Sequence, residues 1–124
     1  MNGDIKVIMV HADHSCGIQD DDKIVGEACG YVIEFSNSVK IYHAGDANGF
    51  GDMAIIRGLY APEIAMIPIG DHYTMSPREA AYACCCSQRS SFPCPSAPEG
   101  QTGRFQKGAP GVAVIEMKPG VTIS

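Results

Sequence analysis

Histidine and aspartate side chains follow three apolar runs of the sequence, at the points where those runs end. They form three pairs: His11 and His14, His43 and Asp46, and Asp71 and His72. Imidazole nitrogens and carboxylate oxygens are the ligands of hydrolytic zinc, manganese or iron sites, and ligands from several strand ends can converge on one ion. The alternative is that each residue is a turn or capping residue. Turn roles do not account for the histidines, so the clustering favours a metal site.

Other patterns that could carry chemistry are weaker. Cys16 lies close to His14, but no oxyanion hole accompanies this pair, and we interpret Cys16 as a small buried thiol. The glycine-rich segment 45–51 lacks the Gly-Lys-Ser/Thr ending of a nucleotide-binding loop. The cysteines at 84–86 and at 94 do not have the C-x₂₋₄-C spacing of a zinc site. None of these patterns competes with the histidine and aspartate pairs.

Length and charge exclude several classes of protein. The chain has 124 residues, 45% of them hydrophobic, and a formal net charge of −5. This length suits one small domain. The net negative charge leaves no basic surface that could bind the phosphates of a nucleic acid. No apolar stretch approaches the roughly 18 residues of a membrane span, and no signal peptide pattern is present at the start. We expect a soluble, cytoplasmic protein that acts on a small molecule.

The apolar runs predict a layered α/β domain. Strands are expected at 5–10 and at 64–69, a final strand at 112–117, and a hairpin at 30–35 and 39–43 with a polar turn between its strands. Helical spacing predicts a helix over about 51–60, and the capping box formed by Ser76 and Glu79 begins another that runs through Ala83. We expect a solvated acidic loop at 19–23 and an irregular segment at about 84–108, which is rich in Ser, Pro and Gly.

Several of these motifs, in their order along the chain, resemble the metallo-β-lactamase superfamily. The similarity is to the C-terminal half of the metal-dependent hydrolases related to L-ascorbate 6-phosphate lactonase. It covers most of residues 4–83 and 111–123. The motifs that carry it are VHADHSCG at 10–17, GYVIEF at 30–35, IYHAGD at 41–46, FGDM at 50–53, IPIGDHYTMSPREAA at 67–81 and MKPGVT at 117–122.

This resemblance implies a fold, a site and a reaction. The fold would be part of an αββα sandwich with its metal site at the strand ends. His14 and Asp46 match metal ligands of the family, and we assign catalytic roles to Asp46 and to the pocket residue His72. The ion would be Zn²⁺ or Mn²⁺, and it would lower the pKa of a bound water towards neutrality. The substrate would be an ester, a lactone or a phosphate ester.

The sequence also departs from the family pattern. The His-x-His-x-Asp-His motif, which supplies most first-metal ligands, does not occur in it, and the anomalous segment 84–108 stands where the last family histidine is expected. We hypothesise that a frameshift produced this segment. Because the ligand motif is missing, the chain would be a fragment, inactive alone, with an uncovered apolar face that favours association into a homo-oligomer. Two alternatives stay open: a non-catalytic small α/β domain with structural histidines, and a protein completed by another chain.

Overall fold

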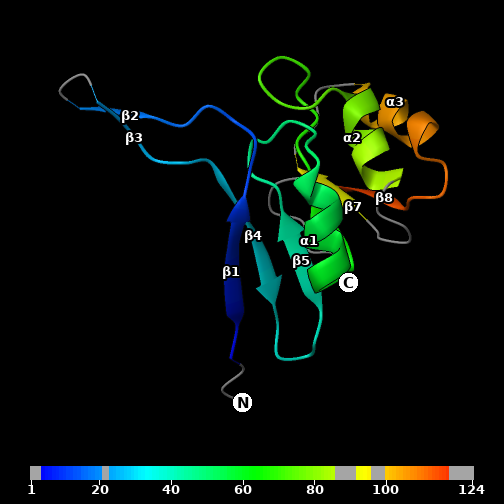
Figure 1. Ribbon diagram of the computed structural model, residues 1–124. Coiled ribbons are helices and arrows are strands. Elements are labelled where there is room, and N and C mark those ends of the chain that lie inside the picture. The colour runs from blue at the N-terminus through cyan, green and yellow to red at the C-terminus, as the bar shows by residue number, and fades with distance from the viewer. Residues whose placement is uncertain (1–3, 21–22, 86–91, 96–99, 118–124) are drawn as a thin grey trace.

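A four-stranded mixed sheet forms the centre of the molecule (Figure 1). The computed structural model describes residues 4–20, 23–85, 92–95 and 100–117. The strand order is β1-β4-β5-β6, with β1 antiparallel to β4, β4 antiparallel to β5, and β5 parallel to β6. The strands are β1 (Lys6–His11), β4 (Cys29–Glu34), β5 (Lys40–His43) and β6 (Ile64–Met66). The predicted α/β class is confirmed.

Strands β4 and β5 form the predicted hairpin. The Ser38 N–H donates to the Phe35 carbonyl at 2.8 Å, and the Val39 N–H donates to Asn37 Oδ1 at 3.1 Å. Ser38 adopts the left-handed conformation with φ 68°. A short polar side chain next to the turn thus satisfies a backbone donor that the strands leave unpaired.

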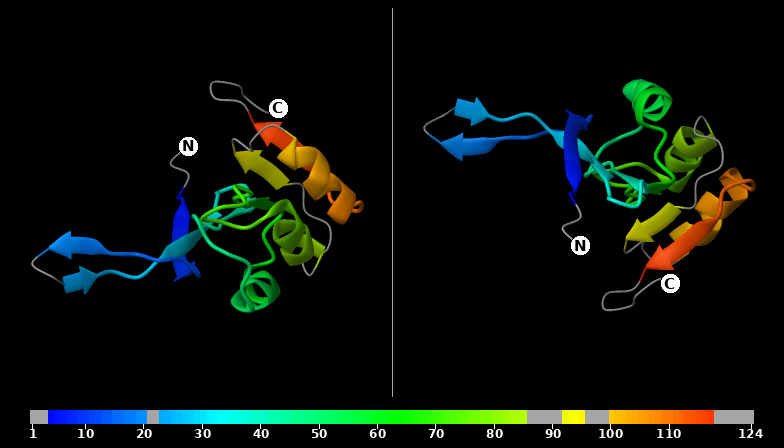
Figure 2. Two further views of the ribbon diagram at one scale, coloured as in Figure 1. Left: turned by 90° about the horizontal axis from the view of Figure 1, so that it is seen from above. Right: turned by 90° about the horizontal axis from the view of Figure 1, so that it is seen from below.

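One face of the sheet packs against helix α1 (Asp52–Tyr60), and we call it the inner face. Val32, Tyr42 and Ala65 lie side by side on this face and are 0%, 5% and 4% exposed. Ile56 of α1 is buried with them in the core. Figure 2 shows the helices gathered on one side of the four-stranded sheet. The apolar stripe of α1 is therefore the reason that this helix forms and docks.

Helix α2 (Pro77–Cys85) begins with the predicted capping box. The Ser76 N–H and hydroxyl each lie 2.8 Å from Glu79 Oε2, and the Glu79 N–H donates to Ser76 Oγ at 3.3 Å. These hydrogen bonds from Ser76 lower the pKa of the Glu79 carboxyl below 4.5. The reciprocal bonds satisfy the free donors at the helix start.

The acidic segment 19–23 is not the simple loop that we predicted. Strands β2 (Ile18–Asp20) and β3 (Lys23–Val25) pair antiparallel here, with Ile18 opposite Val25. Together they form an arm that extends away from the main sheet (Figure 1). Backbone hydrogen bonds pair the two strands of this arm, and such pairing does not require apolar side chains. The acidic composition of the segment therefore led to the wrong prediction.

The prediction of an irregular segment at 84–108 is also wrong for its described part. Strand β7 (Phe92–Pro95) pairs parallel with β8 (Val114–Met117), and helix α3 (Gln101–Gly108) lies between them in the sequence. Phe105 of α3 is 3% exposed, so tertiary packing stabilises a helix that contains glycines and has little intrinsic propensity. The rest of the segment lies outside the described residues, and the frameshift stays a prediction.

Strand β6 is shorter than the apolar run 64–69 predicts. Ile67 and Ile69 are buried as the run requires, but the pairing with β5 stops at Met66. Pro68 has no N–H to donate to a strand ladder. Within the described ranges, no helix has the length and apolar character needed to cross a membrane.

Candidate metal centre

Strand direction brings the predicted site loops to one edge of the sheet. Strands β1, β5 and β6 run the same way, because β4 is antiparallel to both β1 and β5, while β6 is parallel to β5. Hydrogen bonds join the loops that follow: the Asn48 N–H donates to the Asp13 carbonyl at 2.8 Å, and the Ala44 N–H donates to the Met66 carbonyl at 3.0 Å. The loops that follow β1, β5 and β6 therefore leave the same edge of the sheet.

His14 is the best positioned of the predicted ligands. Its ring is half-buried, with Nδ1 2.7 Å from the Ser15 carbonyl and Nε2 3.1 Å from the Tyr73 carbonyl. A carbonyl that accepts from Nδ1–H orients the ring and directs the Nε2 lone pair outward, as in many metal-binding histidines. The carbonyl of Tyr73 faces that same Nε2 atom. A metal ion at Nε2 must therefore displace Tyr73, or the loop that carries it.

Asp46 is exposed and follows a turn that only glycine accommodates. Gly45 has φ 67°, and a Cβ atom there would lie 2.9 Å from the Cys29 carbonyl oxygen. The Gly45 N–H donates to His43 Nδ1 at 3.0 Å. This tight turn points the chain away from β5 immediately before Asp46, so the carboxylate is presented at the sheet edge rather than within the sheet.

The remaining histidines are not arranged as ligands. Since His43 Nδ1 accepts a hydrogen bond, the neutral ring carries its proton on Nε2 and has no lone pair to offer there. His72 is exposed, and its ring meets that of Tyr73 edge-on with centroids 4.3 Å apart. His11 meets Phe50 edge-on at 5.5 Å.

The donors of the described residues do not complete a metal site. Across residues 4–20, 23–85, 92–95 and 100–117, no three His, Cys, Asp or Glu side chains come together in a way that could hold one ion. Zinc sites in proteins use three or four protein ligands. His14 and Asp46 therefore do not fit a complete site by themselves, and their assignment as ligands, like the catalytic assignment of Asp46 and His72, stays a prediction.

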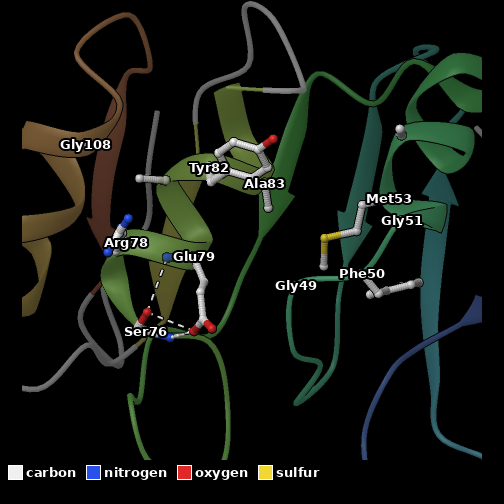
Figure 3. Close-up of a pocket in the computed structure, with 12 residues that line it drawn as sticks. Gly49, Phe50, Gly51, Met53, Ser76, Arg78, Glu79, Tyr82, Ala83 and Gly108 are labelled. Carbon is white, nitrogen blue, oxygen red and sulfur yellow. Dashed lines mark hydrogen bonds between the residues drawn. The ribbon is translucent and has the colours of Figure 1, made fainter.

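A cavity of about 890 Å³ lies elsewhere, between helix α2 and the segment 49–54. Figure 3 shows Glu79 and Tyr82 of α2 on one side and Phe50 and Met53 on the other. None of the predicted site residues lines it. The sequence reasoning missed this cavity, since Phe50 and Met53 have the pattern of an ordinary amphipathic helix start. It also missed the carbonyls around His14, because backbone groups leave no signal in residue type.

Comparison with known proteins places these features in a family. A family model described as "Beta-lactamase superfamily domain" matches residues 1–92. The chain belongs to this superfamily. A UPF0173 metal-dependent hydrolase of Koribacter versatilis is 52% identical over 132 residues, which cover 98% of this chain and 55% of the relative. A second, from Solibacter usitatus, is 57% identical over 84 residues, covering 66% of this chain and 36% of the relative.

A solved structure agrees with the sequence relatives. Igni18, a metallo hydrolase of Ignicoccus hospitalis, has a TM-score of 0.73 and 27% identity, over 96% of this chain and 52% of its own. The chain thus spans about half the length of the proteins that it matches. It has the fold of part of a metal-dependent hydrolase of this superfamily, and the comparisons imply a metal without identifying it.

Proposed function

We propose that this chain is one half of a metal-dependent hydrolase, which cleaves an ester, a lactone or a phosphate ester and is inactive until the missing ligands are supplied. The motifs shared with the relatives of L-ascorbate 6-phosphate lactonase support this substrate class. Nitrogen and oxygen donors such as His14 and Asp46 suit Zn²⁺ or Mn²⁺. Cys16 is exposed and not buried as we interpreted it, and neither Cys16 nor Cys29 forms a disulfide, which supports a reducing, cytoplasmic location.

The orientation of His14 carries the proposal. Its Nδ1 atom lies 2.7 Å from the Ser15 carbonyl, which is the hydrogen bond that prepares the opposite nitrogen for a metal. The Tyr73 carbonyl lies 3.1 Å from Nε2 and must move away before that nitrogen can bind a metal ion. The side chain that the family pattern marks as a ligand is thus held at the strand ends, next to the segment that carries a second site residue.

Asp46 and His72 can reach the same substrate from the solvent side. Both are exposed, and both lie in loops that leave the same edge of the sheet. A carboxylate can accept a proton, and an imidazole can either donate or accept one, which is the chemistry that hydrolysis needs at the attacking water and the leaving group. We assign these proton transfers to the two residues in the completed hydrolase.

The second candidate is a non-catalytic α/β domain in which the histidines are structural. The hydrogen bond that His43 Nδ1 accepts from the Gly45 N–H favours it, since that ring fixes a turn. So does the pairing of both His14 ring nitrogens with carbonyls. The two functions differ in whether His14 and Asp46 bind a metal ion at all.

Equilibrium dialysis of the chain against Zn²⁺ and Mn²⁺ tests the proposal. Because two donors do not complete a site, we expect weak metal binding, which the double variant His14→Ala, Asp46→Ala loses and which His72→Ala keeps, because we assign His72 no ligand role. We also expect no turnover of lactones or phosphate esters by the chain alone. Equal binding by the chain and the double variant, or none by either, would refute the proposal and favour the non-catalytic domain.

A further inference from the structure

The hydroxyl of Tyr42 is a buried polar group to which the fold gives no partner. Tyr42 is 5% exposed, and among the described residues nothing forms a hydrogen bond with its hydroxyl. Buried polar groups in folded proteins nearly always have a partner, so this one calls for an explanation. The Tyr42 side chain lines a small cavity of about 20 Å³ between the inner face of the sheet and helix α1. A partner for the hydroxyl would enter through this cavity.

A single water molecule is a poor partner for this hydroxyl. The small cavity has room for about one water, but a buried water needs about two to four polar neighbours. Among the described side chains that line the cavity, only Tyr42 and Arg57 are polar. A ligand with an apolar body and one polar atom suits such a lining better than water does.

The small cavity adjoins the cavity of about 890 Å³ between α2 and the segment 49–54. Met53 and Ala83 line both cavities, so their side chains form the wall between them. Figure 3 shows both residues at the larger cavity. Methionine has a long, unbranched side chain that adapts its shape readily, and alanine is small. A rotation of the Met53 side chain would therefore open a path from the larger cavity to the Tyr42 hydroxyl.

The larger cavity has a mainly apolar lining with no net charge. Phe50, Met53 and Tyr82 contribute large side chains to it. Within the described chain its only charged lining residues are Arg78 and Glu79, whose opposite charges add to zero. Such a lining favours an uncharged ligand over an anion or a cation. Its volume is typical of sites for small organic molecules.

We propose that the two cavities together bind an uncharged, largely apolar small molecule that carries one oxygen acceptor, such as a ketone. The apolar body occupies the larger cavity, and the oxygen accepts a hydrogen bond from the Tyr42 hydroxyl. Burial raises the pKa of Tyr42 to about 12, so the hydroxyl keeps its proton at neutral pH and can donate it. Neither His14 nor Asp46 lines these cavities, so the inference does not depend on the proposed hydrolysis.

Two probes, acetophenone and α-methylstyrene, test this site on the whole chain. They have nearly the same shape, but α-methylstyrene has a methylene group in place of the carbonyl oxygen. Methyl NMR of methionine-labelled protein follows binding, with Met53 as the reporter and Met9, which is 71% exposed on β1, as the reference. We expect a saturable shift of the Met53 signal alone of these two. The affinity for acetophenone should be about 10-fold higher, because only acetophenone can accept a hydrogen bond from Tyr42.

The variant Tyr42→Phe separates the hydrogen bond from the apolar contacts. It should lower the affinity for acetophenone by about 10-fold and leave the affinity for α-methylstyrene unchanged, which also shows that the cavities are intact. Tyr73→Phe is the matched control, since Tyr73 is 78% exposed and lines neither cavity.

Four results would overturn the proposal. The first is the lack of a saturable shift at Met53, and the second is an equal affinity of the parent for both probes. The third is an equal affinity of the parent and Tyr42→Phe for acetophenone. The fourth is a Met53 shift that depends on protein concentration without a probe, because a second copy of the chain would then occupy the larger cavity.

Discussion

Removal of the Tyr42 hydroxyl is expected to stabilise the fold. Tyr42 is 5% exposed, and within the described part of the chain its hydroxyl oxygen has no hydrogen-bond partner. A buried polar group without a partner costs about 1–3 kcal/mol relative to the hydrated group. Phenylalanine keeps the ring that packs against α1 and lacks the hydroxyl. Tyr42→Phe should therefore raise the free energy of unfolding by about 1 kcal/mol at pH 8.

The advantage of the variant should grow with pH. Burial raises the pKa of Tyr42 from 10.0 to about 12. Between these values the unfolded chain ionises at this residue while the folded chain does not, so stability present below pH 10 is lost as pH rises towards 12. At pH 11 the loss is about 1.4 kcal/mol for a shift of this size. The gap between variant and parent should then reach about 2.4 kcal/mol.

Urea unfolding, followed by circular dichroism at pH 8 and pH 11, measures both effects. Other ionising groups contribute equally to parent and variant, so the change in the gap reports on Tyr42 alone. Tyr73→Phe is the control, because Tyr73 is 78% exposed and its hydroxyl is in water. A loss of stability of about 1 kcal/mol in Tyr42→Phe at pH 8 would show that the hydroxyl is hydrogen-bonded in solution and refute the reasoning. A constant gap between the two pH values would refute the pKa argument.

Three further predictions concern the helices. Ser76→Ala should lower the free energy of unfolding by about 1 kcal/mol, while Ser76→Thr, which keeps the cap, should change it less, as chemical denaturation will show. Because the pKa of Glu79 is lowered in the folded chain, the parent should be more stable than Glu79→Gln at pH 7 and should lose this advantage as pH falls below 4.5. Thermal melts across pH 3–7 can measure this loss. Gly108→Ala should destabilise the chain by about 1–3 kcal/mol, since the new Cβ would meet Ala81 Cβ at 2.7 Å. Adding Ala81→Gly to Gly108→Ala should recover part of the lost stability, because it removes the methyl group that the new Cβ meets. If the effects of the two substitutions on the free energy of unfolding simply add, this contact is contradicted.

Local sequence signals were sufficient where one segment decides its own structure. The hairpin of β4 and β5 follows from two apolar runs and a polar turn. The spacing of Met53, Ile55, Ile56 and Leu59 predicts α1, although Ile55 and Leu59 are 58% and 71% exposed and only Ile56 of this set is buried. The capping box at Ser76 marks the start of α2 within one residue. Hydrogen bonds within a few residues fix the hairpin turn and the capping box, whereas α1 also depends on the packing of Ile56 in the core.

Elements that depend on distant contacts were not predictable in this way. Helix α3 forms because Phe105 is buried by residues far away in sequence, and the apolar signal of Ile67 and Ile69 reports burial rather than strand pairing. The same limit applies to the site. Residue types indicated that His14 belongs with the other strand-end histidines, but its actual hydrogen-bond partners are the backbone carbonyls of Ser15 and Tyr73, which any residue could supply.

The paired strands β1 with β4 and β2 with β3 have a consequence for the order of folding. The two pairs are successive parts of one long hairpin whose strand pairing is interrupted once. The Ala12 N–H donates to the Ala28 carbonyl at 3.2 Å where the interruption begins. Hairpins of this kind close in microseconds, whereas the parallel pairing of β5 with β6 must wait for the connection through α1. We therefore expect the loop of His14 to be placed early in refolding. The loop of His72 would join it only in the last step, when β6 docks and the Tyr73 carbonyl reaches the His14 ring.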